Sequence, residues 1–271
     1  IKKYVDLAVA LKLPYTLIDA EWDEMKDGKS ILDAVNYSKS KGIKPMIWYN
    51  SSTGWVNGAP GPKFRLNKPE DREREFAWCQ SIGVAGVKVD FFGGDKQETM
   101  RLYEAILSDA DDNGLLAIFH GCTLPRGWER MYPNYAGSEA VRASENLIFG
   151  QYECDQEAQA ATLHPFIRNA VGSMEFGGCF FNKRLSRSNQ HGTIRRTTDA
   201  FQIAISVLYQ NPVQNFAITP NNLTDAPEVC IDFMKEVPTL WDETRYVSGC
   251  PGESAVIARR SGRTWYVAAV N

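Results

Sequence analysis

The sequence predicts an α/β fold of the (β/α)8 TIM-type barrel, and three observations lead to it. Short apolar strand patterns alternate with helical patterns, successive strands begin about thirty residues apart, and polar or aromatic residues follow most strands. Alternation on this scale requires a parallel sheet with helical crossovers. No G-x-G-x-x-G motif or P-loop follows a strand, and the number of repeats favours a barrel over a doubly wound sheet.

Composition narrows the classes of protein. The 271 residues can bury the core of one large barrel domain. A net charge of −3 without a Lys/Arg cluster argues against a nucleic-acid surface, and no apolar run approaches the ~18 residues of a membrane-inserted helix. Six cysteines lie far apart without a C-x-x-C pair, which favours buried free thiols over a disulfide framework or a zinc site.

The first half of the chain contains four predicted strands. Apolar residues at helical spacing predict a helix over 2–12, which Pro14 ends, and Pro69 opens a later helix with Glu70 and Asp71 at its positive end. A loop rich in Gly, Pro, Ser and Asn extends to Asn67. The remaining predicted elements alternate: strands over 15–18, 44–50, 84–90 and 115–121, and helices over 31–41, 69–80 and 96–113.

The second half is less regular. We expect a short strand, an irregular stretch with a helical segment near Ala158, and then a helix, a strand and a last helix, over 140–145, 149–196, 198–210, 213–218 and 226–240. From 246 onward the pattern is that of a β-ribbon turning at 261–263. We therefore assign 1–243 to the barrel and 244–271 to the beginning of a C-terminal antiparallel β-domain. Because the chain opens on a helix, the first barrel strand is expected to lie outside it.

The strand that ends at Asp90 carries two charges. Small and β-branched residues precede Lys88 and Asp90, and two glycines follow. Side chains alternate along a strand, so Lys88 and Asp90 share one face. Burying both charges is costly unless they are paired or used, and barrel enzymes place their catalytic residues at this end of the strands.

Other strand ends carry similar residues, whereas the opposite ends do not. A lone aspartate could cap a helix and a lone tryptophan could belong to the core, but the joint pattern indicates an active site. The set comprises Asp19, Glu21, Trp22, Trp48, Asn50, Lys88, Asp90, His120, Arg142 and Glu145.

This set suits glycoside hydrolysis, which needs two carboxyl groups and flat aromatic faces for the sugar ring. We predict that Asp90 is the nucleophile, kept ionised by Lys88, and that Glu145 is the general acid/base. Trp22 and Trp48 are the predicted aromatic faces. A Schiff-base aldolase using Lys88 is the remaining barrel chemistry. Serine or cysteine nucleophiles have little support because no Gly-x-Ser-x-Gly motif is present.

Five motifs in one order carry a resemblance to a known family. The chain resembles glycoside hydrolase family 97, calcium-dependent hydrolases of α-glucosides and α-galactosides, over essentially its whole length. The strand ending in Lys88-Val89-Asp90 is also similar to the nucleophile strand of the related α-galactosidase clan. The motifs lie at 15–22, 87–92, 119–127, 138–146 and 164–175.

The resemblance places the chain among the family's retaining members. Inverting members carry a glutamate of their general-base machinery directly after the histidine matched by His120, and they lack an aspartate at the position of Asp90. This sequence has Gly121 and Asp90. Retaining members have the aspartate as nucleophile, and Glu145 matches the family's acid/base. The resemblance thus implies an exo-acting α-galactosidase whose partner is an oligosaccharide with a terminal α-galactosyl residue.

The resemblance also implies a calcium ion and a set of binding residues. Glu139 matches a calcium ligand, and Glu145 is expected to contact the ion as well; two glutamates alone are weak support for a metal. The substrate-binding residues implied by the matched motifs and strand ends are Asp19, Trp22, Trp48, Lys88, His120 and Arg168.

Family members have an N-terminal β-sandwich that supplies another calcium ligand. That domain lies outside this chain, so we expect an incomplete calcium shell and poor activity of the piece as cut. The resemblance implies a periplasmic or secreted protein. An α-glucosidase, a β-L-arabinopyranosidase and a non-catalytic glycan-binding barrel remain alternatives.

Overall fold

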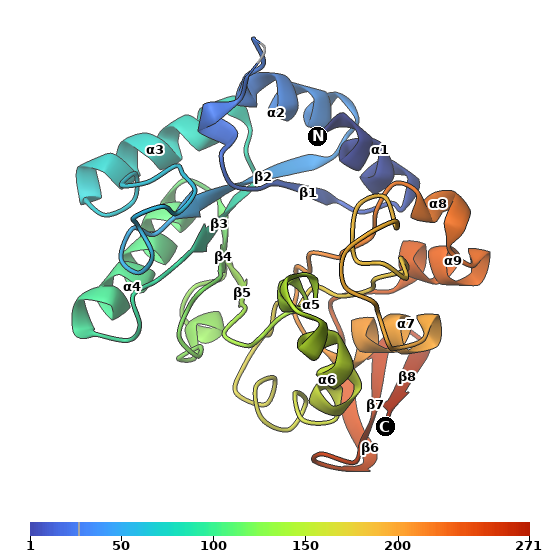
Figure 1. The fold of residues 1–271 in the computed structure, drawn as a ribbon. Coiled ribbons are helices and arrows are strands. Elements are labelled where there is room, and N and C mark those ends of the chain that lie inside the picture. The colour runs from blue at the N-terminus through green and yellow to red at the C-terminus, as the bar shows by residue number, and fades with distance from the viewer. Residues whose placement is uncertain (27) are drawn as a thin grey trace. The chain divides into compact units, whose positions relative to one another are not determined.

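The structure is a computed structural model that describes residues 1–26 and 28–271 (Figure 1). The chain forms two compact units, Ile1–Ala140 and Val141–Asn271. The predicted boundary at 243/244 stays a prediction.

The first unit is a parallel α/β layer. Its described residues form a five-stranded sheet with the order β1-β2-β3-β4-β5. Figure 1 shows α1 to α4 along one face of this curved sheet. Sequential order without reversal, and helices on one face, are features of a barrel wall rather than of a doubly wound sheet. Within the described residues the sheet does not close.

The elements of this unit match the predicted ones closely. The strands are β1 (Tyr15–Ile18), β2 (Lys44–Asn50), β3 (Gly86–Asp90), β4 (Leu116–Phe119) and β5 (Tyr135–Ser138). The helices are α1 (Lys2–Ala10), α2 (Ile31–Ser40), α3 (Pro69–Ile82) and α4 (Gln97–Asp112), with short 3-10 turns η1 (Trp22–Glu24) and η2 (Trp128–Arg130). Helix α3 begins with Pro69 and ends at Ile82; the next residue, Gly83, caps it with a φ of 88°, a left-handed conformation that glycine adopts readily.

Alternation along β3 separates the core from the site. Val87 and Val89 belong to the hydrophobic core, together with Tyr103 of α4 and Phe119 of β4. Lys88 and Asp90 share the opposite face of the strand. The parallel register pairs Trp48 with Lys88, and Asn50 with Asp90, so the polar ends of β2 and β3 lie side by side.

The second unit combines helices with an antiparallel sheet. Its helices are α5 (Glu145–Phe149), α6 (Gln151–Ala161), α7 (Asp199–Leu208), α8 (Asn222–Asp225) and α9 (Glu228–Glu236). In its described part the sheet has the order β6-β7-β8, formed by Glu243–Cys250, Ser254–Ser261 and Thr264–Val270. The buried Arg259 of β7 donates hydrogen bonds to the main-chain oxygens of Val207 and Leu208, which ties this sheet to the end of α7.

Two predicted strands are wrong. The strand expected over 140–145 lies earlier, at β5, because the backbone turns left-handed at Ala140 (φ 41°) and Glu145 begins a helix. The segment 213–218 is not a strand. Its Asn215 N–H donates to the Glu175 carboxylate and its Ala217 N–H to the Gly178 carbonyl, so these donors do not join a ladder.

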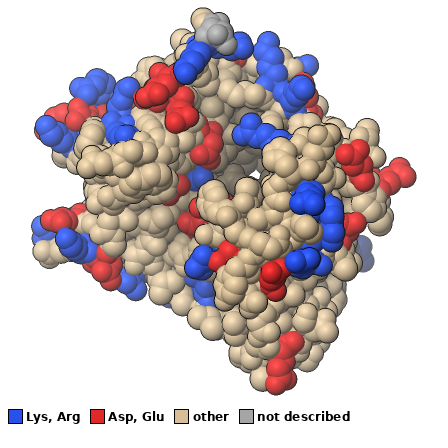
Figure 2. Space-filling model, in the orientation of Figure 1, with Lys and Arg blue, Asp and Glu red and all other residues tan. Residues whose placement is uncertain are grey.

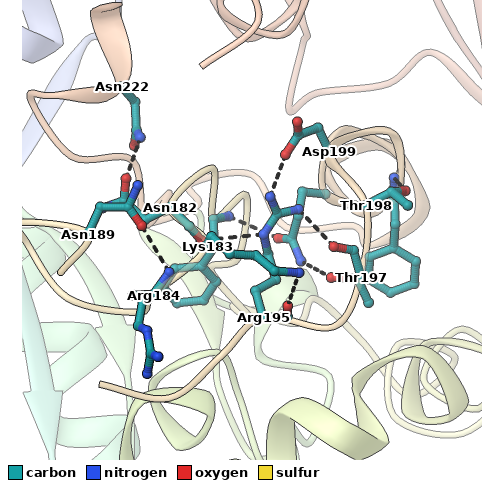
Figure 3. A network of polar contacts seen from close by, with 12 residues as sticks. Asn182, Lys183, Arg184, Asn189, Arg195, Thr197, Thr198, Asp199 and Asn222 are labelled. Carbon is teal, nitrogen blue, oxygen red and sulfur yellow. Dashed lines mark hydrogen bonds and ion pairs between the residues drawn. The ribbon is translucent and has the colours of Figure 1, made fainter. Parts of the chain in front are cut away.

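A polar network replaces regular structure between α6 and α7 (Figure 3). Arg195 donates to the carbonyl oxygens of Asn182 and Thr197 and pairs with Asp199 at 2.5 Å. The Asn222 amide donates to the Asn182 side chain at 2.7 Å. These contacts satisfy main-chain groups that a helix or a sheet would otherwise satisfy.

The imidazole of His164 is partly buried in this second unit. Its ring packs against Phe176 and Tyr209. Burial, and to a smaller extent the positive charge of Arg168, lower the pKa of His164 from 6.5 to about 4. Neutral imidazole is therefore the form that the folded state favours.

We expect the free energy of unfolding to fall as the pH drops from about 6.5 to 4. In that range the unfolded chain binds a proton at residue 164 that the folded chain does not bind, at a total cost of about 3 kcal/mol. Equilibrium urea unfolding at several pH values measures this. The His164→Gln variant should show a flatter dependence, whereas His191→Gln, which changes an exposed histidine, should not. If the free energy of unfolding depends on pH equally in the wild type and in both variants, His164 is not the group responsible.

The charged surface, the hydropathy of the helices and the state of the cysteines can be compared with what the composition predicts. On the face drawn in Figure 2, basic and acidic side chains are interspersed. No helix within residues 1–26 and 28–271 has the length and hydropathy needed to cross a membrane. All six cysteines are free in the described structure, and four of them are buried, which confirms the expected thiols.

Candidate active site

The carboxylate of Asp90 is held by two hydrogen bonds at the end of β3. The residue is 6% exposed. Its Oδ1 accepts from the main-chain N–H of Phe91 at 2.7 Å, and its Oδ2 accepts from the indole N–H of Trp48 at 3.2 Å. Phe91 itself has a left-handed backbone (φ 61°). Both oxygens therefore have a fixed direction, as a group that must attack one carbon requires.

Lys88 lies between two carboxylates. Its Nζ is 3.9 Å from Asp90 Oδ2 and 3.2 Å from Asp19 Oδ2. Lys88 and Asp90 are both buried, whereas the Asp19 side chain is mostly exposed. This confirms that the two charges of the β3 end are paired, and it adds Asp19 from the end of β1. Carboxylate and ammonium groups arranged in this way can bind the hydroxyl groups of a sugar.

Gly121 packs directly against the Asp90 carboxylate. A Cβ at this position would lie 2.8 Å from Asp90 Oδ1 and 2.8 Å from the main-chain nitrogen of Phe91. Real Cβ atoms essentially never come so close, and the φ of 47° is also unfavourable for a residue with a side chain. The carboxylate occupies space that only a glycine leaves open.

His120 and Glu139 follow β4 and β5 and are both buried. Glu139 Oε2 accepts from the N–H of Gly121 at 3.0 Å and lies 3.7 Å from His120 Nδ1. The predicted ligand Glu139 is therefore connected to the Asp90 region through the main chain of Gly121. The parallel pairing of Phe119 with Ser138 brings the two strand ends together.

The two predicted aromatic faces have other roles. Trp22 is 5% exposed, because it stacks on Trp78 and meets the edge of Tyr49, and its N–H donates to the Trp48 carbonyl. It borders a hollow of about 510 Å³ whose lining includes none of the residues that contact Asp90. Trp48 is 1% exposed and acts on Asp90 through its N–H. Neither ring offers a free face to a sugar, which corrects that expectation.

Two predicted site residues belong to the second unit. Glu145 is the exposed first residue of α5. Arg168 is buried and donates to the carbonyl oxygens of Gly172 and Ser173 at 3.1 and 2.8 Å. Apart from Trp22, the first unit thus brings together the remaining predicted residues, which are Asp19, Trp48, Lys88, Asp90, His120 and Glu139.

Comparison with known proteins assigns the family. The glycoside hydrolase 97 model matches residues 1–141, and the glycosyl-hydrolase 97 C-terminal (oligomerisation) model matches residues 240–271. This chain belongs to glycoside hydrolase family 97. The family suggested by the sequence motifs is confirmed.

The individual proteins that this chain resembles carry two kinds of name. A probable retaining alpha-galactosidase of Streptomyces bingchenggensis is 33% identical over 98% of the chain, and a retaining alpha-galactosidase of Bacteroides thetaiotaomicron is 29% identical over 99%. A solved crystal structure of a beta-arabinopyranosidase is 62% identical over 99% of the chain, with a TM-score of 0.96. The chain spans 39% and 40% of the length of the two curated relatives and 43% of the solved one.

The sequence did not indicate two residues of this site, Phe91 and Trp55. Phe91 donates its N–H to Asp90, and Asn50, one of the predicted strand-end residues, fixes the loop after β2 through its side-chain amide. Trp55 presents an exposed ring on that loop. A tryptophan next to a glycine in a polar loop directly after a strand end was the available signal for Trp55. Nothing in the sequence indicates the left-handed backbone of Phe91.

Proposed function

We propose that the protein is a retaining exo-glycosidase with Asp90 as nucleophile and Glu145 as general acid/base. The observation that carries the proposal is the Asp90 carboxylate, oriented by Trp48 and Phe91 and placed against the bare Cα of Gly121. We also propose that β1 to β5 are part of a closed (β/α)8 barrel. The family assignment supports both proposals.

The reaction proceeds in two displacements. An Asp90 oxygen attacks the anomeric carbon while the bond to the leaving oxygen breaks, and Glu145 gives that oxygen its proton. Glu145 then removes a proton from a water molecule, whose oxygen displaces Asp90 from the same carbon. Lys88 and Asp19 bind hydroxyl groups of the sugar. Two inversions leave the product with the configuration of the substrate.

The two kinds of relative suggest closely similar sugars. β-L-Arabinopyranose has the ring of α-D-galactopyranose, including the axial 4-hydroxyl, but lacks the hydroxymethyl group on C5. A site that recognises the ring hydroxyls can therefore accept both. The 62% identical structure favours β-L-arabinopyranosides as the preferred substrate. The 33% and 29% identical relatives support terminal α-galactosides, the sequence-based prediction, as the second candidate.

Aryl glycosides and proton NMR on the full-length protein test the proposal. We expect cleavage of p-nitrophenyl β-L-arabinopyranoside and α-D-galactopyranoside, and a much lower kcat/KM for the α-D-glucopyranoside, whose 4-hydroxyl is equatorial. The first-formed sugar should keep the anomeric configuration of the substrate. The opposite anomer would overturn the retaining mechanism, and binding of these sugars without cleavage would indicate a glycan-binding barrel.

Calcium binding is a separate proposal, and the first unit offers one residue for it. Glu139 is a buried carboxylate at the edge of the sheet where the strands end, and its oxygens are the hard donors that calcium prefers. The imidazole of His120, close to it, is a less suitable ligand. Glu139 and Glu145 are the residues that would hold the ion, whose positive charge would offset the negative charge of the carboxylates around it.

Removing calcium is expected to lower the melting temperature of the full-length protein. A ligand at one hundred times its Kd stabilises the folded state by about 2.7 kcal/mol. Thermal unfolding with a chelator and then with excess calcium measures the shift. Glu139→Gln should lose most of the shift, whereas Glu98→Gln, which alters an exposed carboxylate on α4, should keep it. A melting temperature that does not respond to calcium would reject the site.

A further inference from the structure

Three aromatic rings form a row that starts at the nucleophile. The Trp48 indole donates to Asp90 and meets Phe91 edge to face, with ring centroids 5.7 Å apart. Phe91 in turn meets Trp55 edge to face at 5.0 Å. Exposure rises along this row, from 1% for Trp48 to 52% for Trp55. The outer end of the row is an indole ring that the described part of the chain leaves exposed.

The loop that carries Trp55 is bonded to the end of β3. The N–H of Ser51 donates to the Asp90 carbonyl at 2.8 Å, and the N–H of Gly54 donates to the Phe91 carbonyl at 2.9 Å. A Cβ on Gly54 would lie 2.5 Å from that same carbonyl oxygen, so glycine is required for this approach. Trp55 is therefore the neighbour of Gly54, which is hydrogen-bonded to Phe91. The N–H of Phe91 in turn orients the Asp90 carboxylate.

Two polar groups of Trp55, its carbonyl and its indole N–H, are also held by the loop. The Asn50 side-chain amide donates to the Trp55 carbonyl at 3.2 Å, and the indole N–H of Trp55 donates to the Asn57 carbonyl at 2.8 Å. An exposed tryptophan whose main chain and N–H are already bonded loses little conformational freedom on binding a ligand. Such a ring suits the apolar face of a sugar.

We propose that Trp55 is the platform for the leaving group of the substrate, the sugar or aryl ring attached to the bond that is cleaved. The inference builds on the proposed glycosidase function. The terminal sugar must place its anomeric carbon against Asp90 itself, and Trp55 lies one aromatic ring farther out, beyond Phe91. A ring bound there belongs to the next residue of the glycan.

Glycosyl fluorides separate the two binding positions, because fluoride carries no ring. For the full-length Trp55→Ala variant we expect kcat/KM to fall about five- to tenfold on p-nitrophenyl glycosides and disaccharides, the size of one lost aromatic contact. The same variant should cleave the corresponding glycosyl fluoride at the wild-type rate. Trp55→Phe should recover most of the loss. Trp265→Ala, which removes an exposed tryptophan of β8, is the matched control and should change neither substrate.

The outcomes distinguish this inference from the proposed function. An equal loss on fluoride and aryl substrates, or no loss on either, would overturn the platform while leaving the glycosidase intact. A wild-type protein that cleaves neither the glycosyl fluoride nor the aryl glycosides would instead reject the glycosidase function. If alanine lowers the melting temperature, Trp55→Leu keeps the contact with Phe91 without a flat face and takes its place in the comparison.

Discussion

Replacing Asp90 by glycine is expected to lower kcat by about 10⁴-fold or more, because the covalent step loses its nucleophile. The deletion leaves space for a small anion beside the anomeric carbon. Azide should therefore restore turnover of an activated aryl glycoside and give a glycosyl azide of inverted configuration, the β-galactosyl azide from an α-galactoside. Proton NMR of the product and the rate with azide measure both effects in the full-length protein.

A carboxylate on the following loop supplies the control for that variant. Asp95 is exposed and lies five residues after Asp90, where it pairs loosely with Arg126 at 3.8 Å. Asp95→Gly should keep wild-type kcat and should not respond to azide. An Asp90→Gly protein that retains substantial activity without azide, or that forms no glycosyl azide, would show that another group is the nucleophile.

Adding one methyl group at Gly121 is expected to lower kcat by about 10²-fold with little change in KM. The new Cβ meets Asp90 Oδ1 and the main-chain nitrogen of Phe91, both at 2.8 Å. The main chain of Phe91 is fixed by the loop after β2, so the carboxylate must move. A displacement of about 1 Å at a reacting group can cost 10²-fold in rate. Steady-state kinetics of Gly121→Ala on an aryl glycoside test this.

Gly127→Ala separates the contact from backbone strain. Gly127 also has a positive φ, 81°, and lies on the same loop, but a Cβ there would meet nothing within 4 Å. Both variants should lose a similar ~1 kcal/mol of stability from the left-handed conformation, and only Gly121→Ala should lose activity. Equal kinetic effects of the two substitutions would exclude the proposed contact with Asp90.

This contact also suggests why the family divides by mechanism. The resemblance implies that inverting relatives have a glutamate where this chain has Gly121 and lack the aspartate at position 90. With the backbone described for this chain, a side chain at 121 and the carboxylate at 90 occupy the same space. The two residues are therefore expected to exclude each other. Gly121→Glu alone should inactivate the protein rather than change its stereochemistry.

Much of the first unit could be predicted from the sequence, because its signals are local. Strands β1 and β2 begin and end where their apolar runs do, and α3 begins at the predicted Pro69. The pairing of Lys88 with Asp90 also follows from local geometry, since alternate residues of a strand share a face. In the second unit, the main-chain donors of 213–218 bond to the distant Glu175 and Gly178, and no local pattern reveals those partners.

The sequence by itself therefore determined the alternation of strands and helices, the family and the residues that carry charge at the strand ends. Only the tertiary structure decided what the aromatic residues do. Trp22 and Trp48 are tryptophans at or just after a strand, where a ring that binds a sugar would also be expected. Packing covers both rings, and the Trp48 N–H donates a hydrogen bond to Asp90. Whether a side chain is covered depends on neighbours distant in sequence, such as Trp78 for Trp22, and residue type does not encode that.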